Sequence, residues 1–151
     1  MKLLRGELPL VIEGSFKPWA ISVGHSKLLV RGVIGDPEGD DPLRVFDILF
    51  QDVSRIALSD QYDGIDLRLA QAGVKDVEER RVGHKWPAAS MWLLSRERLA
   101  DYVVAGRVYW AEVAVPAGMP SPLLTENPEP GDFVGCLYFL VTGQVLVGGS
   151  A

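Results

Sequence analysis

Asp47 is the residue of this chain whose surroundings most suggest chemistry. Its neighbours on the same face of an expected strand, Val45 and Leu49, are apolar. A carboxylate buried among apolar side chains needs a partner, and Arg31 or Arg44 could provide one. The pattern indicates either a structural ion pair or a pocket carboxylate. We therefore treat Asp47 and Arg31 as candidate ligand-binding residues.

Trp110 is the third candidate ligand-binding residue. It follows Tyr109 in a segment rich in strand-forming residues, Arg107–Val115. Successive side chains of a strand point to opposite faces, so one of these two aromatic rings must face away from the core. An exposed tryptophan suits sugar stacking or a protein hot spot. A second covering layer or an oligomer interface explains the same pattern.

An acidic loop carries four carboxylates within six residues: Asp36, Glu38, Asp40 and Asp41. The alternate spacing resembles that of a calcium-binding loop. However, Pro37 and Pro42 stiffen the segment, and no bidentate glutamate follows at the required distance. A solvated hairpin loop is the other interpretation, and the sequence leaves both open.

The remaining reactive side chains predict no catalytic residue, metal site or cofactor. His25 and His84 are the only histidines, and their spacing does not pre-align two metal ligands. No GxSxG nucleophile turn and no GxGxxG dinucleotide loop occurs. The single cysteine, Cys136, is expected to be buried and inert. An enzyme is therefore the less favoured class.

Length and composition predict one globular domain spanning residues 1–151, with 48% hydrophobic and 23% charged residues. The net charge of −5 argues against a nucleic-acid partner. Arg5 and Glu7 interrupt the N-terminal apolar run, which predicts neither a signal peptide nor a membrane span. With a single cysteine, the expected location is the cytoplasm.

Strand patterns dominate the chain. Period-two alternation and β-branched residues predict strands at Trp19–Val23, Lys27–Ile34, Leu43–Phe50, Ile65–Ala70, Arg107–Val115 and Phe133–Val141. The first strand of the segment Leu43–Ala70 either continues past a bulge at Gln51-Asp52 or is followed by a separate short strand. The last strand is apolar on both faces, which predicts a central, covered position. Val145–Val147 is expected to pair back onto it.

A helix is predicted over Arg96–Ala105. Ser95 can cap its start and Gly106 can end it. For Val74–Arg81, a charged helix and a polar edge strand both fit. Together these elements predict a mainly β (α+β) fold: an antiparallel barrel or sandwich of about seven strands with one helix near residues 96–105.

The chain is poor in residues that carry chemistry, so a non-enzymatic protein-interaction module is the preferred function. The partner protein would contact an acidic sheet face or the irregular segment Pro116–Pro130. The alternatives are a small-molecule or carbohydrate-binding β-domain and a carboxylate-dependent hydrolase or isomerase. The composition fits a soluble bacterial protein, and its high apolar fraction also allows a homodimer.

Overall fold

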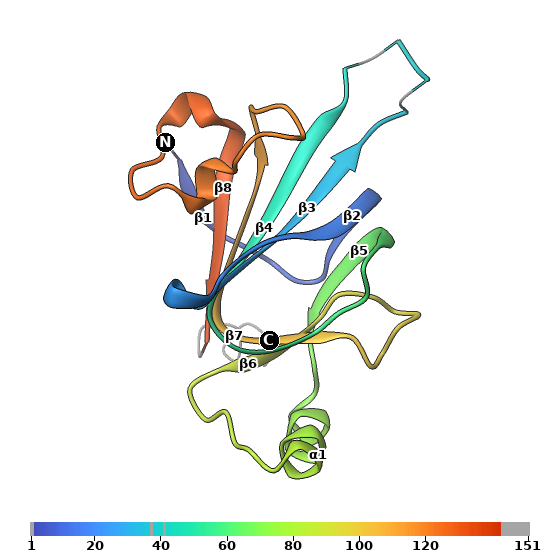
Figure 1. Ribbon diagram of the computed structural model, residues 1–151, viewed down its shortest axis with the longest axis vertical. Coiled ribbons are helices and arrows are strands. Elements are labelled where there is room, and N and C mark those ends of the chain that lie inside the picture. Colours follow the sequence, from blue (N-terminus) through green and yellow to red (C-terminus); the bar gives the residue numbers. More distant parts are fainter. Residues whose placement is uncertain (1, 37, 41, 143–151) are drawn as a thin grey trace.

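The computed structural model describes residues 2–36, 38–40 and 42–142 (Figure 1). Its strands are β1 (Leu3–Arg5), β2 (Leu10–Ser22), β3 (Lys27–Ile34), β4 (Arg44–Ala57), β5 (Tyr62–Leu69), β6 (Ser90–Leu93), β7 (Tyr102–Val113) and β8 (Phe133–Val141). The α-helix of the described chain is α1 (Ala72–Val82), and short 3-10 turns lie at Val23–His25, Pro122–Leu124 and Pro130–Asp132.

The strands form one sheet that closes on itself. Their order is β1-β8-β7-β4-β3-β2-β5-β6, and β6 also pairs with β7, which closes the six strands β2–β7 into a barrel. All pairings are antiparallel except that of β1 with β8. Of the predicted alternatives, an antiparallel barrel or a sandwich with one helix, the barrel is therefore confirmed. Closure leaves no free edge along the paired part of the barrel.

Alternation along β4 divides its side chains between two layers. Ile48 and Phe50 join the cluster that fills the barrel, together with buried rings such as Phe16, Trp92 and Trp110. Val45 and Leu49 point outward into a second cluster. The segment that follows β7 contributes Leu123 to that cluster and covers the outer face of β4 and β7 there. The barrel thus has a core on both faces of these strands.

A third cluster lies outside the barrel near α1. It contains Trp86, Met91, Leu93, Tyr102 and Val104. Trp86 and Ala89 of this cluster come from the segment that connects α1 to β6, and Val82 at the end of α1 packs against it. The helix fully buries none of its side chains and lies at one end of the molecule. This partial contact leaves an open groove between the helix and the barrel.

The bulge predicted in the first half of Leu43–Ala70 is present. Asp52 adopts a left-handed conformation (φ 56°), and the pairing of β4 with β7 shifts register between Val53 and Arg55. Aspartate tolerates this conformation better than most residues because its short polar side chain can bond locally. The strand continues past the bulge to Ala57, as one of the two predictions stated.

The prediction of a helix over Arg96–Ala105 is wrong. Ser95 Oγ does accept bonds from the backbone N–H of Glu97 (3.2 Å) and Arg98 (3.3 Å), as a capping residue would, but the chain then turns into β7. Residues 102–105 are buried on both strand faces, since the barrel core lies on one side and the third cluster on the other. Two-sided burial removes the alternation that would have marked a strand. The helix is instead α1, which includes the undecided segment Val74–Arg81.

Strand β8 has the predicted bounds but not the predicted central position. It is second from the edge of the sheet, between β7 and the three-residue β1, and Val134 is exposed. Its apolar residues on the two faces serve the barrel core and the outer cluster. The proposed return strand Val145–Val147 lies outside the described residues. Over the part that is described, no helix is long and apolar enough to cross a membrane.

Candidate functional site: an apolar groove beside α1

Arg31 and Asp47 form a buried ion pair on the outer face of the barrel. The two residues are cross-strand partners on β3 and β4, and they are 2% and 0% exposed. The guanidinium Nε donates to Asp47 Oδ1 and Nη2 donates to Oδ2, both at 2.8 Å. This bidentate geometry is the most favourable one for an arginine–carboxylate pair. Arg44, the other partner considered, pairs instead with Glu112 at the surface.

The third nitrogen of Arg31 holds the segment that follows β7. Its Nη1 donates to the carbonyl oxygens of Ala117 (2.9 Å) and Met119. The ring of Trp19 lies over the guanidinium, 5.4 Å from ring centre to Cζ. All three guanidinium nitrogens therefore bond to the protein itself, an arrangement suited to anchoring a loop.

Trp110 lies on the opposite face of the sheet from this ion pair. Its ring lies in the barrel core, 3% exposed, stacked on Tyr138 with 6.0 Å between ring centroids. Gly6 packs against it so closely that a Cβ there would lie 2.2 Å from the indole ring. Of the two neighbouring aromatic residues Tyr109 and Trp110, Tyr109 points outward and packs on the second cluster. Ligand binding by Asp47, Arg31 and Trp110 remains a prediction.

The acidic loop connects β3 and β4. In it the backbone N–H of Glu38 donates to Asp36 Oδ1 at 3.0 Å, an ordinary turn. Asp41 lies outside the described residues. Among those described, no group of three or more His, Cys, Asp or Glu side chains is placed to hold a metal ion.

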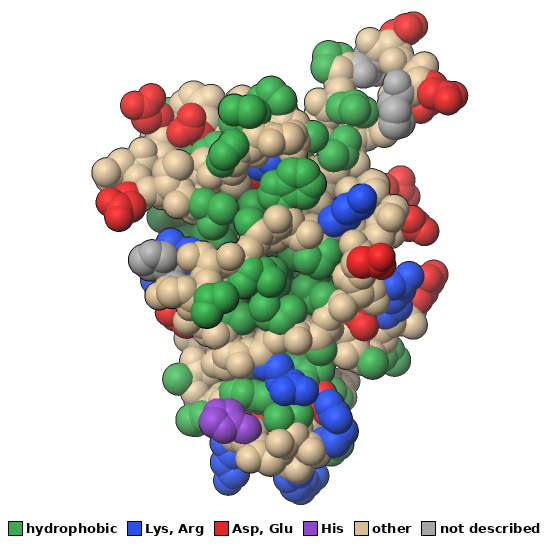
Figure 2. Space-filling view, in the orientation of Figure 1, with side chains coloured by type: hydrophobic (Ala, Val, Ile, Leu, Met, Phe, Trp, Pro, Cys, Tyr) green, Lys and Arg blue, Asp and Glu red, His purple; other side chains and the backbone are tan. Residues whose placement is uncertain are grey.

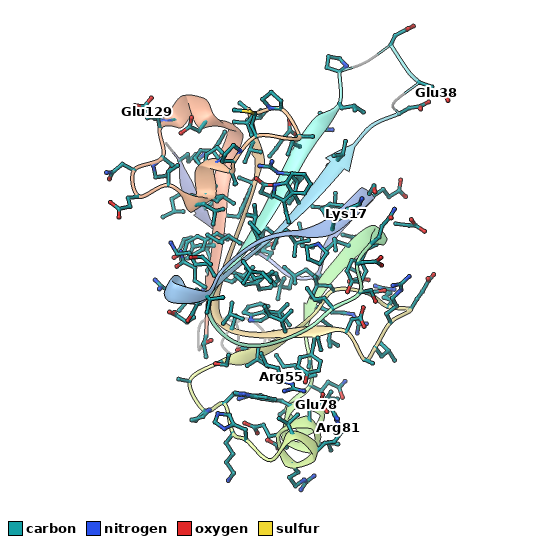
Figure 3. The ribbon with its side chains drawn as sticks, viewed as in Figure 1. Lys17, Glu38, Arg55, Glu78, Arg81 and Glu129 are labelled. Atoms are coloured by element: carbon teal, nitrogen blue, oxygen red, sulfur yellow. The ribbon has the colours of Figure 1, made fainter. Side chains whose placement is uncertain are left out.

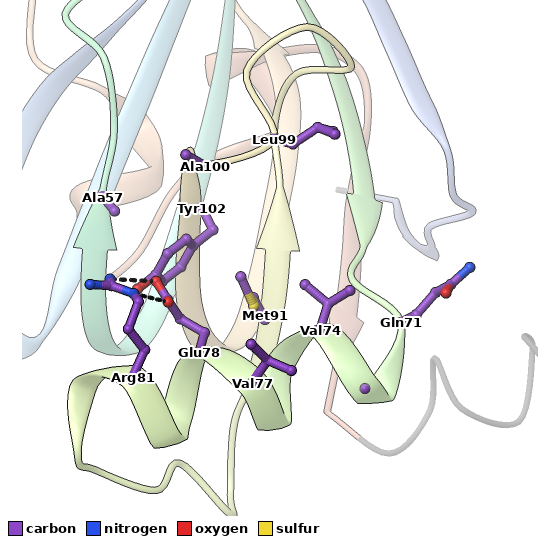
Figure 4. A pocket seen from close by; sticks show the side chains of 11 residues that line it. Ala57, Gln71, Val74, Val77, Glu78, Arg81, Met91, Leu99, Ala100 and Tyr102 are labelled. Atoms are coloured by element: carbon purple, nitrogen blue, oxygen red, sulfur yellow. Dashed lines mark hydrogen bonds and ion pairs between the residues drawn. The ribbon is translucent and has the colours of Figure 1, made fainter.

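A large opening in the described surface is an apolar groove that none of the candidate residues lines. It encloses about 600 Å³ between α1, the ends of β4, β6 and β7, and the loop before β7 (Figure 4). Val74 and Val77 on the helix are 44% and 57% exposed, and Leu99 on the loop is 63% exposed. Met91 and Tyr102 form the buried floor. The groove thus exposes aliphatic side chains over a hydrophobic base.

The helix wall follows from the spacing of its side chains. Val74, Val77, Glu78 and Arg81 have the i, i+3, i+4, i+7 spacing that places residues on one helix face. The helix is held by its other side: Lys75 Nζ donates to the Trp86 carbonyl (2.7 Å), and the Trp86 N–H donates to Glu79 Oε2 (2.6 Å). The valine stripe consequently has no partner element in the described chain.

The loop wall is also fixed in place. Asp101 Oδ2, just before β7, accepts bonds from Ser59 Oγ and Tyr62 Oη, both at 2.6 Å. Burial by itself raises the pKa of the Asp101 carboxyl, but the hydrogen bonds from Ser59 and Tyr62 together outweigh this and hold the pKa below its usual value. Burial, and secondly the hydrogen bond to Asp101, raise the pKa of Tyr62 to about 12. Leu99 is therefore presented from an anchored loop.

A polar cluster closes one end of the groove. Glu78 pairs with Arg81 and with the Tyr102 hydroxyl, and Arg55 Nε donates to that hydroxyl at 2.8 Å. The bonds from Arg81 and Tyr102 lower the pKa of Glu78 to about 2. Each charged group of this cluster is already paired, so the cluster offers no unengaged base or nucleophile.

Charge is distributed unevenly along the molecule. Residues 68–98, which include α1, carry seven of the 15 Lys and Arg but only four of the 20 Asp and Glu. Their net charge is +3, against −8 for the remaining residues. Figure 2 shows Lys and Arg gathered at the α1 end and Asp and Glu at the opposite end, where Figure 3 labels Glu38 and Glu129. The groove therefore opens at the basic end of an acidic protein.

Sequence reasoning missed this groove. Its lining residues come from four separate parts of the chain, and no motif connects them. One local signal was available: the valines of α1 lie on one face of a segment otherwise rich in charge.

Comparison with models of protein families, with curated proteins and with solved structures gave no match.

Proposed function

We propose that this protein is a non-enzymatic interaction module whose groove beside α1 binds an apolar segment of an acidic partner protein. The observation that carries the proposal is the exposure of Val74, Val77 and Leu99 on facing walls of one groove. Clustered exposed aliphatic side chains over a buried base are typical of surfaces that a partner covers. The proposal keeps the cytoplasmic location and the exclusion of nucleic acid that the sequence predicts.

The shape of the groove favours a polypeptide over a small molecule. Pockets for small ligands surround most of the ligand surface and are usually rich in aromatic side chains. This groove is open along its length, and Tyr102 is the one aromatic residue in its lining. A segment of another protein can follow an open groove and continue beyond it.

The charge distribution supports an acidic partner. The helix end carries the net positive charge of residues 68–98, and Arg80 and Arg98 are exposed there. Complementary charge speeds association and disfavours partners of the wrong sign. Catalysis is not supported at this site, because Glu78 and Arg81, its two charged lining residues, neutralise each other.

Two labelled peptides test the proposal. Both contain the central sequence Val-Leu-Val-Leu; one is flanked by two Glu on each side and the other by two Lys. Fluorescence polarisation should show saturable binding of the Glu peptide and at least tenfold weaker binding of the Lys peptide. Val77→Asp and Leu99→Asp should each weaken binding of the Glu peptide at least tenfold, because they place a charge in the apolar contact.

Val11→Asp serves as the matched control, since Val11 is equally exposed (63%) on β2, outside the groove lining. It should leave peptide binding unchanged. The proposal is wrong if neither peptide binds, if both bind equally, or if Val11→Asp weakens binding as much as Val77→Asp does.

A further inference from the structure

The end of β4 has a sheet partner on one side only. Beyond the bulge, Arg55, Ile56 and Ala57 pair with β7 as far as Tyr102. On the other side, the register with β3 stops at Gln51, and one further bond joins the Val53 N–H to the Ser26 carbonyl. β4 extends beyond the tip of the β2–β3 hairpin. Within the described residues, Ser54–Ala57 therefore presents an unpaired strand edge. Such an edge is a template for another strand.

A second depression lies beside this edge. It encloses about 340 Å³ between the tip of the β2–β3 hairpin and the end of β4. Ile21, Val23 and Ile56 line it and are 61%, 86% and 37% exposed. Lys27 and Arg55 are the charged residues of its lining, which includes no carboxylate. It therefore combines exposed aliphatic side chains, which the groove also has, with positive charge in its own lining.

The depression and the groove lie on opposite faces of the same strand end. Ile56 lines the depression and Ala57 lines the groove. Successive side chains of a strand point to opposite faces, so the edge runs between the two concavities. A strand added along it would direct alternate side chains to each of them.

We propose that the acidic partner segment binds in an extended conformation, as an additional strand on the Ser54–Ala57 edge of β4. This inference rests on the proposed function and defines its mode of recognition. Backbone hydrogen bonds to the edge provide affinity, and aliphatic side chains entering the two concavities provide specificity. Acidic residues flanking the aliphatic ones face Lys27 on the side of the depression, and Arg55 with the basic α1 end on the side of the groove.

Backbone methylation of the Glu peptide tests this mode. In an added strand, every second N–H bonds to the edge and the others point away. Two variants of the peptide carry N-methyl groups on the first and third, or on the second and fourth, of the central residues. One variant should bind at least tenfold more weakly than the unmodified peptide and the other within about twofold of it. In the complex, hydrogen exchange of at least one backbone amide within Ser54–Ala57 should slow at least tenfold.

The outcomes separate this inference from the proposed function. If both methylated variants bind alike, or if no amide of Ser54–Ala57 is protected, the segment does not add a strand and the inference fails. The proposed function survives that result as long as the unmodified Glu peptide binds in preference to the Lys peptide. If the unmodified peptide does not bind, both fail.

Discussion

Replacing Arg31 by methionine would test whether the buried ion pair holds the outer layer onto the barrel. Methionine keeps an unbranched apolar stem like that of arginine but lacks the guanidinium group, so the two 2.8 Å hydrogen bonds to Asp47 are lost. It also removes the donor that serves the carbonyls of Ala117 and Met119. Asp47, fully buried, would keep a charge with no partner.

The expected loss of stability is large because water does not reach the pair. Breaking a buried ion pair from one side typically costs about 3–5 kcal/mol, and the loss of the donor to the part-buried carbonyls of Ala117 and Met119 adds to this. We expect Arg31→Met to lower the free energy of unfolding by about 4 kcal/mol. That is a large share of the roughly 5–15 kcal/mol of a typical domain.

Urea unfolding of three variants measures the effect. Arg31→Met should shift the midpoint strongly, and the double variant Arg31→Met/Asp47→Leu should recover at least about 2 kcal/mol of the loss, since it removes the unpaired charge. Arg44→Met is the control: its pair with Glu112 is exposed, with 59% of the arginine side chain accessible, so its loss should stay below about 1 kcal/mol. A loss for Arg31→Met no larger than that for Arg44→Met would refute the reasoning, as would a double variant less stable than the single one.

Three further predictions concern pH and packing. The pKa of Glu78, lowered to about 2, means that its pairing stabilises the protein above pH 4.5 and that this stability is lost between pH 4.5 and 2. In urea titrations, Glu78→Gln should therefore have a free energy of unfolding roughly 1 kcal/mol lower than wild type at pH 7, a value already reduced for solvent screening. Near pH 2 the two proteins should be equally stable. The same difference at both pH values would contradict this reasoning. The pKa of Tyr62, raised to about 12, means that stability is lost as pH rises from 10 to 12, and Tyr62→Phe should not show this loss in thermal unfolding. Gly32→Ala would place a Cβ 2.2 Å from the buried ring of Phe16, so it should lower the free energy of unfolding by about 1–3 kcal/mol or more, whereas Gly73→Ala, with open space at its Cβ, should not.

The sequence alone determined most of the strands, because strand alternation is a local property. β3 and β8 have the predicted bounds, and the bulge near Asp52 was one of the two alternatives that the sequence allowed. The sequence also singled out Asp47, because its neighbours on the same strand face, Val45 and Leu49, are apolar. The sequence left open a structural ion pair or a pocket carboxylate, and the structure shows the ion pair with Arg31.

Tertiary structure decided the rest. Pairing of β6 with β7 chose a closed barrel over a sandwich, and no local pattern encodes that contact. Residues 102–105 resembled a helix because two layers bury both of their faces, which hides the period of the strand. The groove exists because α1 attaches through Trp86 and leaves Val74 and Val77 uncovered, opposite a leucine from a distant loop. Such a surface depends on distances between elements, and those distances are determined only when the barrel closes.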